Sequence, residues 1–397
     1  MKTNKNRVVP KLRFPEFYNN GEWKIEKLES ITHSISSGKD NKASNGDYPL
    51  YGSTGIIGET DEVSHVGSYI LVARVGANAG LLNFVTGEFG VSDNTLVVSV
   101  KKTSANINFI YYFLTSYRLN KLVFGSGQPL ITGRQLKSIE LGLPNIEEQK
   151  KIADCLSSLD TLINAENEQL DILEEYKAGL LQQLFPAEGE TTPKLRFAEF
   201  KDDGDWEEVK LVDLAKFRRG SFPQPYGLAE WYDDKNGMPF VQVYDVSDNL
   251  KLKSTTKRKI SKLATEQSVF IPEGTLIITI QGSIGRVAIT QYDAYIDRTL
   301  LIFQEFFKPV DKFFLAYVLQ LLFYIEKQKA PGGIIKTITK EALSSFKINL
   351  PDIGEQQKIA DCLSSLDNLI QAKDEKIKML KEHKQGLMQQ LFPTQNM

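Results

Sequence analysis

The ten residues KIADCLSSLD occur twice in this chain without a difference, at residues 151–160 and 358–367. The flanking sequence extends the repeat, because residues 143–186 align without a gap to residues 350–393, with 29 of 44 positions identical. Chance does not produce such agreement, so we expect the two segments to fold in the same way.

Each copy has the pattern of one long helix between two prolines. Asn145 with Glu148, and Asp352 with Glu355, resemble the capping box that satisfies free N–H groups at a helix start. Apolar residues then recur at spacings of four and three, which is the a/d stripe of a coiled coil. They are Ile152, Leu156, Leu159, Ile163, Leu170, Leu173, Leu180 and Leu184, and Ile359, Leu363, Leu366, Ile370, Ile377, Leu380, Leu387 and Leu391. Roughly 38 helical residues make a rod of about 57 Å.

Charged residues interrupt the stripe at equivalent sites, Glu166 and Lys177 in one copy and Lys373 and Lys384 in the other. Glu166 opposite a lysine of the second helix fits an antiparallel pairing. That pairing places residue 393 near residue 10, so that the chain ends repeat in space the junction between LFP and PKLRF within residues 184–197. We therefore expect a pseudo-two-fold axis through the rod.

A second, shorter repeat precedes each of the two regions that lead into a helix, which are called lobes here. PKLRFPEFYNNGEW at residues 10–23 matches PKLRFAEFKDDGDW at residues 193–206. Its offset is 183 residues against 207 for the helices, so the two intervening lobes differ by 24 residues. The predicted order is a frame segment (1–23), a first lobe (24–143), a helical spacer (144–186), a linker with the repeated frame (187–206), a second lobe (207–350), a second spacer (351–393) and a tail (394–397).

Both lobes contain short β-type runs broken by glycine and proline, followed by helical stretches, which predicts compact mixed α/β domains. The strands are expected at 68–76, 95–100, 240–246, 275–280 and 299–303, and the helices at 108–123 and 312–328. The lobes also share a skeleton, since LVARVGANAGLLN parallels IITIQGSIGRVAI and SDNTLVVS parallels IDRTLLIF. The fold class is thus α+β, with two mixed α/β lobes and an antiparallel coiled coil.

Composition excludes several classes of protein. With 41% hydrophobic and 25% charged residues, the chain has the composition of a globular protein. No apolar run reaches the roughly 18 residues that a membrane span needs, and the first residues lack the apolar core of a signal peptide, so we expect a cytoplasmic protein. The lobes carry net charges of +1 and +4, whereas the helical segments carry −6 and −1. Cys155 and Cys362 occupy equivalent helical sites and are interpreted as small buried residues, with a disulfide the less favoured alternative.

Signatures of catalysis are missing. GSGQPLITG follows a helix and does not open one, so it is a poor nucleotide-binding loop, and SSGKD lacks the flanking residues of a P-loop. His33, His65 and His383 have no metal-ligand spacing. What remains is Arg, Lys and Gln beside glycines on loops. Arg and Gln make bidentate contacts to guanine and adenine edges, and glycine lets a backbone approach phosphates. Each loop taken singly is more typical of a plain turn carrying solvated charges. Its recurrence at matching positions in both lobes brings the binding interpretation level with that one.

The repeated LPxIxEQxKIADxLSSLDxLI…GLxQQLFP helices, the PKLRF…GxW frames and the two divergent lobes resemble the DNA specificity subunit of type I restriction-modification systems. The resemblance covers nearly the whole chain. It implies that each lobe is a target recognition domain for one half of a bipartite, asymmetric DNA site, and that the rod sets the spacer between the halves. It also implies two adenine methyltransferase subunits and restriction subunits as partners. S-adenosylmethionine, ATP and Mg are then expected on those partners, and no cofactor or catalytic residue on this chain.

On this interpretation the lobes read bases in the major groove and anchor phosphates. The expected phosphate anchors are Lys39, Arg218, Arg219, Lys257, Arg258 and Lys336. The expected base readers are Gln128, Gln281, Ser283 and Arg286, with Tyr51, Ser53, Arg74 and Asn78 in support. The competing hypothesis is an interaction scaffold with two ligand-binding lobes and no nucleic acid, and a self-contained nuclease comes third.

Arg286→Ala is expected to relax or abolish recognition of one half-site while assembly with the partners stays intact. Mapping of methylated adenine measures this, and full methylation of the original sequence by the variant would contradict the assignment of Arg286.

Overall fold

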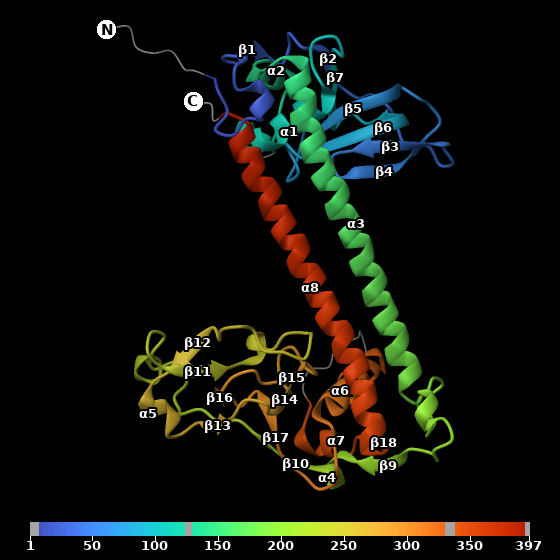
Figure 1. Cartoon of the computed structure of the whole chain (residues 1–397), viewed down its shortest axis with the longest axis vertical. Helices are drawn as coiled ribbons and strands as arrows, with labels where there is room; N and C mark the ends of the chain where they lie inside the picture. The colour runs from blue at the N-terminus through green and yellow to red at the C-terminus, as the bar shows by residue number, and fades with distance from the viewer. Residues whose placement is uncertain (1–7, 124–128, 330–337, 394–397) are drawn as a thin grey trace. The chain divides into compact units, whose positions relative to one another are not determined.

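The computed structural model describes residues 8–123, 129–329 and 338–393 (Figure 1). The chain forms two compact units. Unit 1 comprises Met1–Glu168 with Glu375–Met397, and unit 2 comprises Gln169–Asp374. Each unit therefore holds one lobe, the first half of one long helix and the second half of the other.

The two repeated segments are helices of 39 residues each, α3 (Ile146–Leu184) and α8 (Ile353–Leu391). All the a/d residues named above are buried or half-buried. In unit 1, Leu391 near the end of α8 shares a core with Ile152 near the start of α3. In unit 2, Leu184 at the end of α3 shares a core with Ile359. The start of each helix thus packs with the end of the other, which confirms the antiparallel pairing.

The charged residues within the stripe are paired across the two helices. In unit 1, Lys376 Nζ lies 2.6 Å from Glu166 Oε1, which confirms that Glu166 faces a lysine. In the same unit Lys384 lies 2.5 Å from Asp160, and its counterpart in unit 2, Lys177, lies 2.5 Å from Asp367.

Tyrosines of the lobes join these ion pairs. Tyr112 donates to Asp160 at 2.7 Å, and Tyr317 donates to Asp367 at 2.5 Å. Burial, and then the hydrogen bond to the aspartate, raise the pKa of both phenols. A charged side chain that interrupts the apolar stripe therefore fixes the register of the helices and also attaches the lobe to them.

The expected junction of the chain ends is confirmed. In unit 1, the N–H of Leu12 donates to the carbonyl of Gln390 at 3.0 Å. In unit 2, the N–H of Leu195 donates to the carbonyl of Gln183 at 2.9 Å. The same hydrogen bond thus joins the frame to the end of a helix in both units, through the linker in one and near the chain ends in the other.

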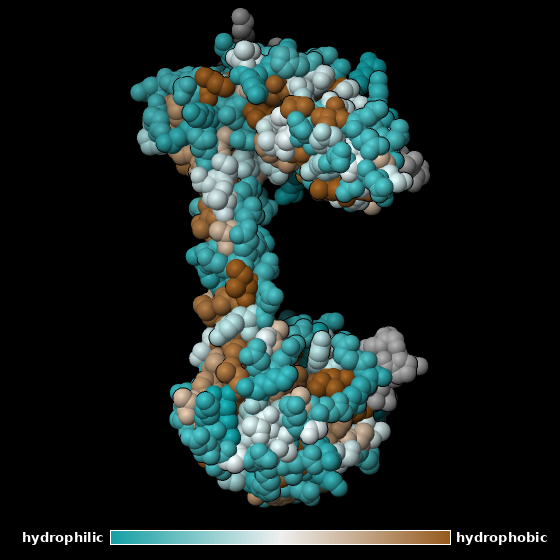
Figure 2. Space-filling model, turned by 90° about the vertical axis from the view of Figure 1, so that its right-hand side faces the viewer, coloured by the Kyte–Doolittle hydropathy of each residue, from teal (hydrophilic) through white to brown (hydrophobic). Residues whose placement is uncertain are grey.

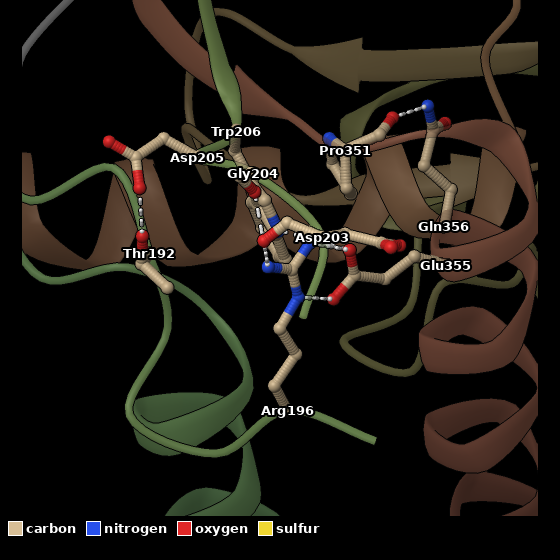
Figure 3. Close-up of polar contacts among 9 residues, drawn as sticks. All are labelled: Thr192, Arg196, Asp203, Gly204, Asp205, Trp206, Pro351, Glu355 and Gln356. Carbon is tan, nitrogen blue, oxygen red and sulfur yellow. Dashed lines mark hydrogen bonds and ion pairs between the residues drawn. The ribbon is translucent and has the colours of Figure 1, made fainter. Parts of the chain in front are cut away.

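A buried carboxylate near the start of each long helix binds the preceding frame, and Figure 3 shows this contact in unit 2. In unit 2, Arg196 donates to both oxygens of Glu355, at 2.8 and 2.7 Å, and the indole N–H of Trp206 donates to the same carboxylate at 3.2 Å. The side chains of Arg196 and Glu355 are 8% and 1% exposed. Arg196 also donates to the carbonyls of Asp203 and Gly204, and its hydrogen bond to Glu355 raises its pKa.

Unit 1 repeats this clamp. Arg13 donates twice to Glu148, both times at 2.7 Å, and Trp23 donates to Glu148 at 3.1 Å. The predicted capping box is therefore half right. Asn145 does accept from the N–H of Glu148, at 2.9 Å. The carboxylates of Glu148 and Glu355, however, bind the arginine and tryptophan of the frame. A guanidinium makes bidentate, charge-assisted hydrogen bonds to a carboxylate, which are stronger than a bond to a backbone N–H.

The next helix residue connects the helix to its lobe. In unit 1, Gln149 donates to the carbonyl of Pro144 at 2.8 Å and accepts from the N–H of Asn106 at 2.8 Å. In unit 2, Gln356 donates to Pro351 at 2.8 Å and accepts from the N–H of Asp311 at 2.9 Å. The Glu-Gln pair in each repeat thus holds the frame on one side and the lobe on the other.

Lobe 1 has a six-stranded sheet in the order β2-β7-β5-β6-β3-β4 and a separate antiparallel pair, β1 with β8. Its elements are β1 (Lys24–Lys27), β2 (Thr32–Ser37), β3 (Tyr48–Gly52), β4 (Gly55–Thr60), β5 (His65–Ala73), β6 (Leu82–Val91), β7 (Thr95–Val100), α1 (Ile107–Tyr117), α2 (Gly133–Lys137) and β8 (Glu140–Leu143). Phe109 and Leu114 of α1 share a core with Ile70 and Val98 of the sheet.

Lobe 2 has two four-stranded sheets, β10-β17-β14-β15 and β12-β11-β16-β13, and the pair β18 with β9. Its elements are β9 (Glu207–Lys210), α4 (Leu211–Leu214), β10 (Ala215–Arg219), β11 (Met238–Val241), β12 (Arg258–Ile260), α5 (Lys262–Thr265), β13 (Val269–Ile271), β14 (Leu276–Thr279), β15 (Val287–Ile289), β16 (Ala294–Ile296), β17 (Leu300–Phe306), α6 (Lys312–Lys329), α7 (Lys340–Ser344) and β18 (Lys347–Leu350). The order β2-β7-β5-β6 of lobe 1 matches β10-β17-β14-β15, which confirms the predicted shared skeleton.

Two predicted elements differ from the structure. The strand expected at 240–246 ends at Val241, and a 3₁₀ turn, η5 (Val243–Asp245), follows it. The carboxylate of Asp245 accepts from the N–H groups of Gln242 and Lys257, at 2.9 Å each, and so turns the chain. The helix expected at 108–123 ends at Tyr117, because Arg118 adopts a left-handed conformation with φ 58° before the 3₁₀ helix η2 (Leu119–Leu122).

Most of the surface drawn in Figure 2 is hydrophilic, with scattered apolar patches. Within the described residues, none of the helices has the length and apolar character that crossing a membrane requires.

Glu148→Ala is expected to destabilise the protein by about 3–5 kcal/mol, because it leaves the buried Arg13 without its counter-charge. Denaturant unfolding followed by tryptophan fluorescence measures the loss. Glu147→Ala removes the same charge from an exposed neighbouring position and serves as the control. Equal stability of the two variants would contradict a structural role for the clamp.

Candidate nucleic-acid interface

In lobe 1, separate segments meet at the turn between β6 and β7, residues 92–94, called here the lobe 1 turn. The N–H of Ser92 donates to the carbonyl of Tyr51 at 2.9 Å, and the N–H of Arg74 donates to the carbonyl of Asn94 at 2.9 Å. The backbones of β3 and of the loop after β5 are therefore both held against the turn.

Lobe 2 has the same arrangement at the turn between β16 and β17, residues 297–299, called the lobe 2 turn. The N–H of Asp297 donates to the carbonyl of Val241 at 3.1 Å, and the N–H of Ile280 donates to the carbonyl of Thr299 at 2.9 Å. These bonds make Val241 the counterpart of Tyr51, and Ile280 the counterpart of Arg74. The two lobes thus share a backbone corner and differ in its side chains.

A glycine brings a further segment to each corner. A Cβ at Gly38 would lie 2.0 Å from the carbonyl oxygen of Val91, and a Cβ at Gly220 would lie 2.2 Å from that of Ile296. Only glycine permits such an approach. As a result Lys39 in lobe 1 and Arg219 in lobe 2, each next to its glycine in sequence, lie beside the corner.

The lobe 1 turn gathers three of the predicted residues. Lys39 is exposed, whereas Tyr51 and Arg74 are half-buried. Tyr51 packs edge-on against Phe89, with ring centroids 5.5 Å apart. The structure does not bring Ser53 and Asn78 to the turn through any backbone contact among the described residues. They lie in the β3–β4 connection and in the loop after β5.

Asp40 orders the chain that follows Lys39. Its carboxylate accepts from the N–H of Val91 at 2.6 Å and from the hydroxyl of Ser64. Ser64 also contacts His65, whose pKa is lowered by burial, an effect that the nearby Asp40 opposes. This network holds the loop of Lys39 against the end of β6.

Next to the lobe 2 turn, three tyrosines each carry a cation on the ring, and we call them the tyrosine surface. The ring centroids lie 3.8 Å from the guanidinium carbon of Arg258 for Tyr232, 4.9 Å from the ammonium of Lys257 for Tyr244, and 5.3 Å from the guanidinium carbon of Arg298 for Tyr226. Phe222 packs against Tyr226 and Tyr232, with centroids 4.8 and 5.6 Å apart. The tyrosine surface therefore presents positive charges that lie on aromatic rings. Such a surface suits a ligand that carries both negative charges and flat rings, as a nucleic acid does.

A chain of hydrogen bonds runs through this surface. Tyr226 donates to the carboxylate of Asp297, which is 2% exposed. The amide nitrogen of Gln242 donates to the hydroxyl of Tyr226 at 2.8 Å, and Tyr244 donates to the amide oxygen of Gln242. Thr299 donates to Asp297 through its N–H at 2.9 Å and through its hydroxyl at 2.5 Å. The buried aspartate thus anchors a polar network that ends at the surface.

The tyrosines stay protonated in this network. Burial, and then the hydrogen bond to Asp297, raise the pKa of Tyr226. Burial, and then the charge of Asp245, raise the pKa of Tyr244. Both phenols therefore remain donors at neutral pH.

The other predicted residues of lobe 2 fall into two places. Arg218 and Arg219 are exposed on β10. Gln281, Ser283 and Arg286 lie in the β14–β15 loop, where Arg286 pairs with Asp248 at 2.8 Å and donates to the carbonyl of Val246.

The β14–β15 loop and Arg286 line a cavity of about 710 Å³ beside α6. Gln128 and Lys336 lie outside the described residues. The structure therefore brings Lys257 and Arg258 to the tyrosine surface, where Arg258 also pairs with Asp234 at 3.2 Å, and it pairs Arg286 with Asp248 beside the cavity.

Sequence reasoning missed Tyr226, Gln242, Tyr244, Asp297 and Arg298. These residues come from segments far apart in the chain, so no local motif identifies them. The one available signal was Arg298, which lies in the IDRTLLIF stretch that parallels SDNTLVVS of lobe 1.

No group of three or more histidine, cysteine, aspartate or glutamate side chains suited to a metal ion occurs in residues 8–123, 129–329 and 338–393. Cys155 and Cys362 are both free thiols, and burial raises the pKa of each. Both side chains are half-buried, so the interpretation as small buried residues is only partly right.

Comparison with known proteins finds similarity in both halves of the chain. The family model described as type I restriction modification DNA specificity domain matches residues 20–175 and 203–382. Two curated relatives come from Methanocaldococcus jannaschii. The putative type I restriction enzyme MjaX specificity subunit is 27% identical over 344 residues, which cover 83% of this chain and 76% of the relative. The type I restriction enzyme MjaVIII specificity subunit is 26% identical over 354 residues, 81% and 78% of the two chains.

Among solved structures, the type I restriction-modification system S subunit from M. genitalium is similar over 98% of this chain and 100% of its own. The TM-score is 0.68 and the sequence identity is 17%, so the likeness concerns the fold.

Proposed function

Because the chain belongs to the type I restriction-modification DNA specificity family, with matches that span both lobes and most of both helices, we propose that it is the sequence-recognition subunit of a type I restriction-modification complex. Each lobe reads one half of a bipartite, asymmetric DNA site. The observation that carries the proposal is the shared backbone corner with different side chains. Lobe 1 presents the half-buried Tyr51 and Arg74, whereas their counterparts Val241 and Ile280 are buried and lobe 2 presents the neighbouring Gln242 and Arg298. One scaffold with two side-chain sets is what reading two different half-sites requires.

DNA binding divides between phosphate anchors and base contacts. The exposed cations beside the corners, Lys39, Arg219 and Lys257, contact phosphates, which position the protein without reading sequence. Arg258, which lies on the ring of Tyr232 and pairs with Asp234 at 3.2 Å, is a further phosphate anchor, and base readout comes from neutral polar groups. The chain itself performs no catalysis, and the adenine methyltransferase and restriction subunits supply S-adenosylmethionine, ATP and Mg.

The helices offer two equivalent docking positions. Leu162 and Leu369 occupy the same place in the two repeats and are 40% and 46% exposed, and Ile172 and Met379 are likewise equivalent, at 64% and 62%. Unit 1 contains Leu162 and Met379, and unit 2 contains Leu369 and Ile172. Apolar surface is visible on the helical part in Figure 2. One apolar pair per unit fits two copies of one partner, which we assign to two methyltransferase subunits.

The alternative function, a scaffold without nucleic acid, requires the cationic surfaces to have no affinity for DNA. Binding of the purified complex to random double-stranded DNA, measured by fluorescence anisotropy at several salt concentrations, separates the two functions. A specificity subunit gives binding that weakens steeply with salt.

Lys257→Ala is expected to weaken DNA binding uniformly across sequences and to reduce the slope of log affinity against log salt by about one, since one phosphate contact is lost. Lys347→Ala removes an equal charge from β18, away from the tyrosine surface, and is the control. An unchanged salt slope for Lys257→Ala would remove Lys257 from the phosphate anchors.

Leu162→Asp or Leu369→Asp is expected to lower the number of bound methyltransferase subunits from two to one, because a charge replaces apolar contact area at one docking position. The double variant then binds none. Native mass spectrometry of the assembled complex counts the subunits. Thr161→Asp places the same charge on the adjacent exposed residue and is expected to keep both partners. Two bound copies on the double variant would place docking elsewhere.

A further inference from the structure

We propose that base readout also uses one charged side chain in each lobe, Arg298 for a guanine in lobe 2 and Asp93 for a cytosine in lobe 1. The two residues occupy the middle of the lobe 2 turn and of the lobe 1 turn. The inference rests on the proposed function, and it names the chemical groups that the two half-sites present to these turns.

The middle residues of the two turns are structural counterparts. Ser92 and Asp297 begin the turns, since the N–H of each donates to a neighbouring strand. The turns then close with the same hydrogen bond. The N–H of Thr95 donates to the carbonyl of Ser92 at 3.2 Å, and the N–H of Leu300 donates to that of Asp297 at 3.1 Å. One backbone shape therefore presents an acidic side chain in lobe 1 and a basic one in lobe 2. Aligning the letters of SDNT and IDRT shifts this correspondence by one residue, so it rests on the backbone.

Both middle side chains are exposed and lack a counter-charge. Within residues 8–123, 129–329 and 338–393, no hydrogen bond or ion pair engages the guanidinium of Arg298 or the carboxylate of Asp93. Arg298 lies 5.3 Å from the ring of Tyr226, which offers its N–H groups no acceptor oxygen. Arg258 on the same surface differs, because it pairs with Asp234 at 3.2 Å. The polar groups of both middle residues are therefore available to a ligand.

A structural role in the turn does not account for these side chains. Aspartate is common in turns because its carboxylate accepts from nearby backbone N–H groups. The carboxylate of Asp93 accepts no such bond in the described part of the chain. In lobe 2 the turn is held by the buried Asp297, whose carboxylate accepts from the N–H and the hydroxyl of Thr299. Neither turn therefore needs the side chain of its middle residue.

The opposite charges of the two middle residues argue against a phosphate contact at this position. Phosphates carry the same charge in both half-sites, whereas base edges differ. An aspartate at the position of Arg298 would repel a phosphate, yet lobe 1 has Asp93 there. By contrast, both corners carry a cation next to the glycine, Lys39 in lobe 1 and Arg219 in lobe 2. We therefore assign the cations beside the glycines to phosphates and the middle residues to bases.

The chemistry of the two side chains selects the bases. A guanidinium directs two parallel N–H groups at the O6 and N7 acceptors of guanine in the major groove. A carboxylate only accepts, and cytosine presents only a donor there, its N4 amino group. Adenine sets its N7 acceptor beside its donor, and guanine and thymine present acceptors, so a carboxylate disfavours all three. Each half-site is thus expected to contain a G·C pair, read through its guanine in lobe 2 and through its cytosine in lobe 1.

The test uses the complex of the full chain with its methyltransferase subunits. Mapping of N6-methyladenine in a genome that expresses the wild-type complex first gives the recognised site. Pools of duplex DNA, each randomised at one position of that site, are then bound by wild-type and variant complexes, and the bound DNA is sequenced. The base preference at every position and the overall affinity are thereby measured separately.

For Arg298→Ala, a preference for guanine of roughly tenfold to a hundredfold at one position is expected to shrink to near one, while the other half-site keeps its preferences. Arg298→Gln offers a donor and an acceptor, and is expected to move that preference from guanine toward adenine. Arg219→Ala removes a neighbouring phosphate anchor, and is expected to weaken binding to all sequences alike without changing a preference.

For Asp93→Ala, a preference for cytosine at one position of the opposite half-site is expected to shrink in the same way. Asp93→Asn adds a donor at unchanged size, and is expected to move that preference toward adenine. Glu29→Ala removes an exposed carboxylate from the connection between β1 and β2, and is expected to leave every position unchanged. Thermal unfolding of each complex confirms that the variants are folded.

Different outcomes overturn the proposed function and the role of the turns. A wild-type complex that methylates no defined sequence would overturn the proposed function. With a defined site, a half-site without a G·C pair would overturn the role of the turns alone. So would a uniform loss of affinity for Arg298→Ala, or a uniform gain for Asp93→Ala, with all preferences kept, because both are the effects of a position that faces phosphates.

Discussion

The buried pairing of a frame arginine with a helix glutamate is the contact on which each unit depends. Arg13 with Glu148, and Arg196 with Glu355, place full charges where little water reaches them, since the arginine side chains are 8% exposed and the glutamates 1%, so each charge needs the other for compensation. Tryptophan completes the carboxylate shell in both units. Because the arginine precedes the lobe in sequence and the glutamate follows it, the pairing ties the two ends of the lobe together at the start of a long helix.

Around this contact the two units agree in detail. The same glutamine joins helix to lobe, and the same lysine, aspartate and tyrosine combine where the apolar stripe is interrupted. The backbone corner of the lobes is also the same, down to the glycine that passes within contact distance of it. Difference is concentrated in the side chains that the corner carries. The contacts that the two units share are therefore a separate set of residues from the corner side chains that we propose for recognition.

The helices, their antiparallel pairing and the shared skeleton were predictable because they rest on local periodicity and on repetition within one sequence. The capping box was half right, since Glu148 has the spacing of a cap but a better partner in Arg13, 135 residues away. The strand at 240–246 was wrong beyond Val241, because the buried Asp245 turns the backbone. The tyrosine surface could not be predicted from the sequence, for a related reason. Tyr226, Gln242 and Asp297 meet only through tertiary packing, and a lone glutamine in a β-rich segment carries no signal.

All residues of the clamp lie outside residues 24–143 and 207–350, in the frames and the helices. The contacts that hold the two ends of a lobe therefore do not depend on the lobe's own sequence. Substitutions at a backbone corner leave the residues of the clamp unchanged, and a whole lobe moved between two chains with these frames meets the same arginine, tryptophan and glutamate. The clamp thereby allows a lobe to be exchanged as one unit.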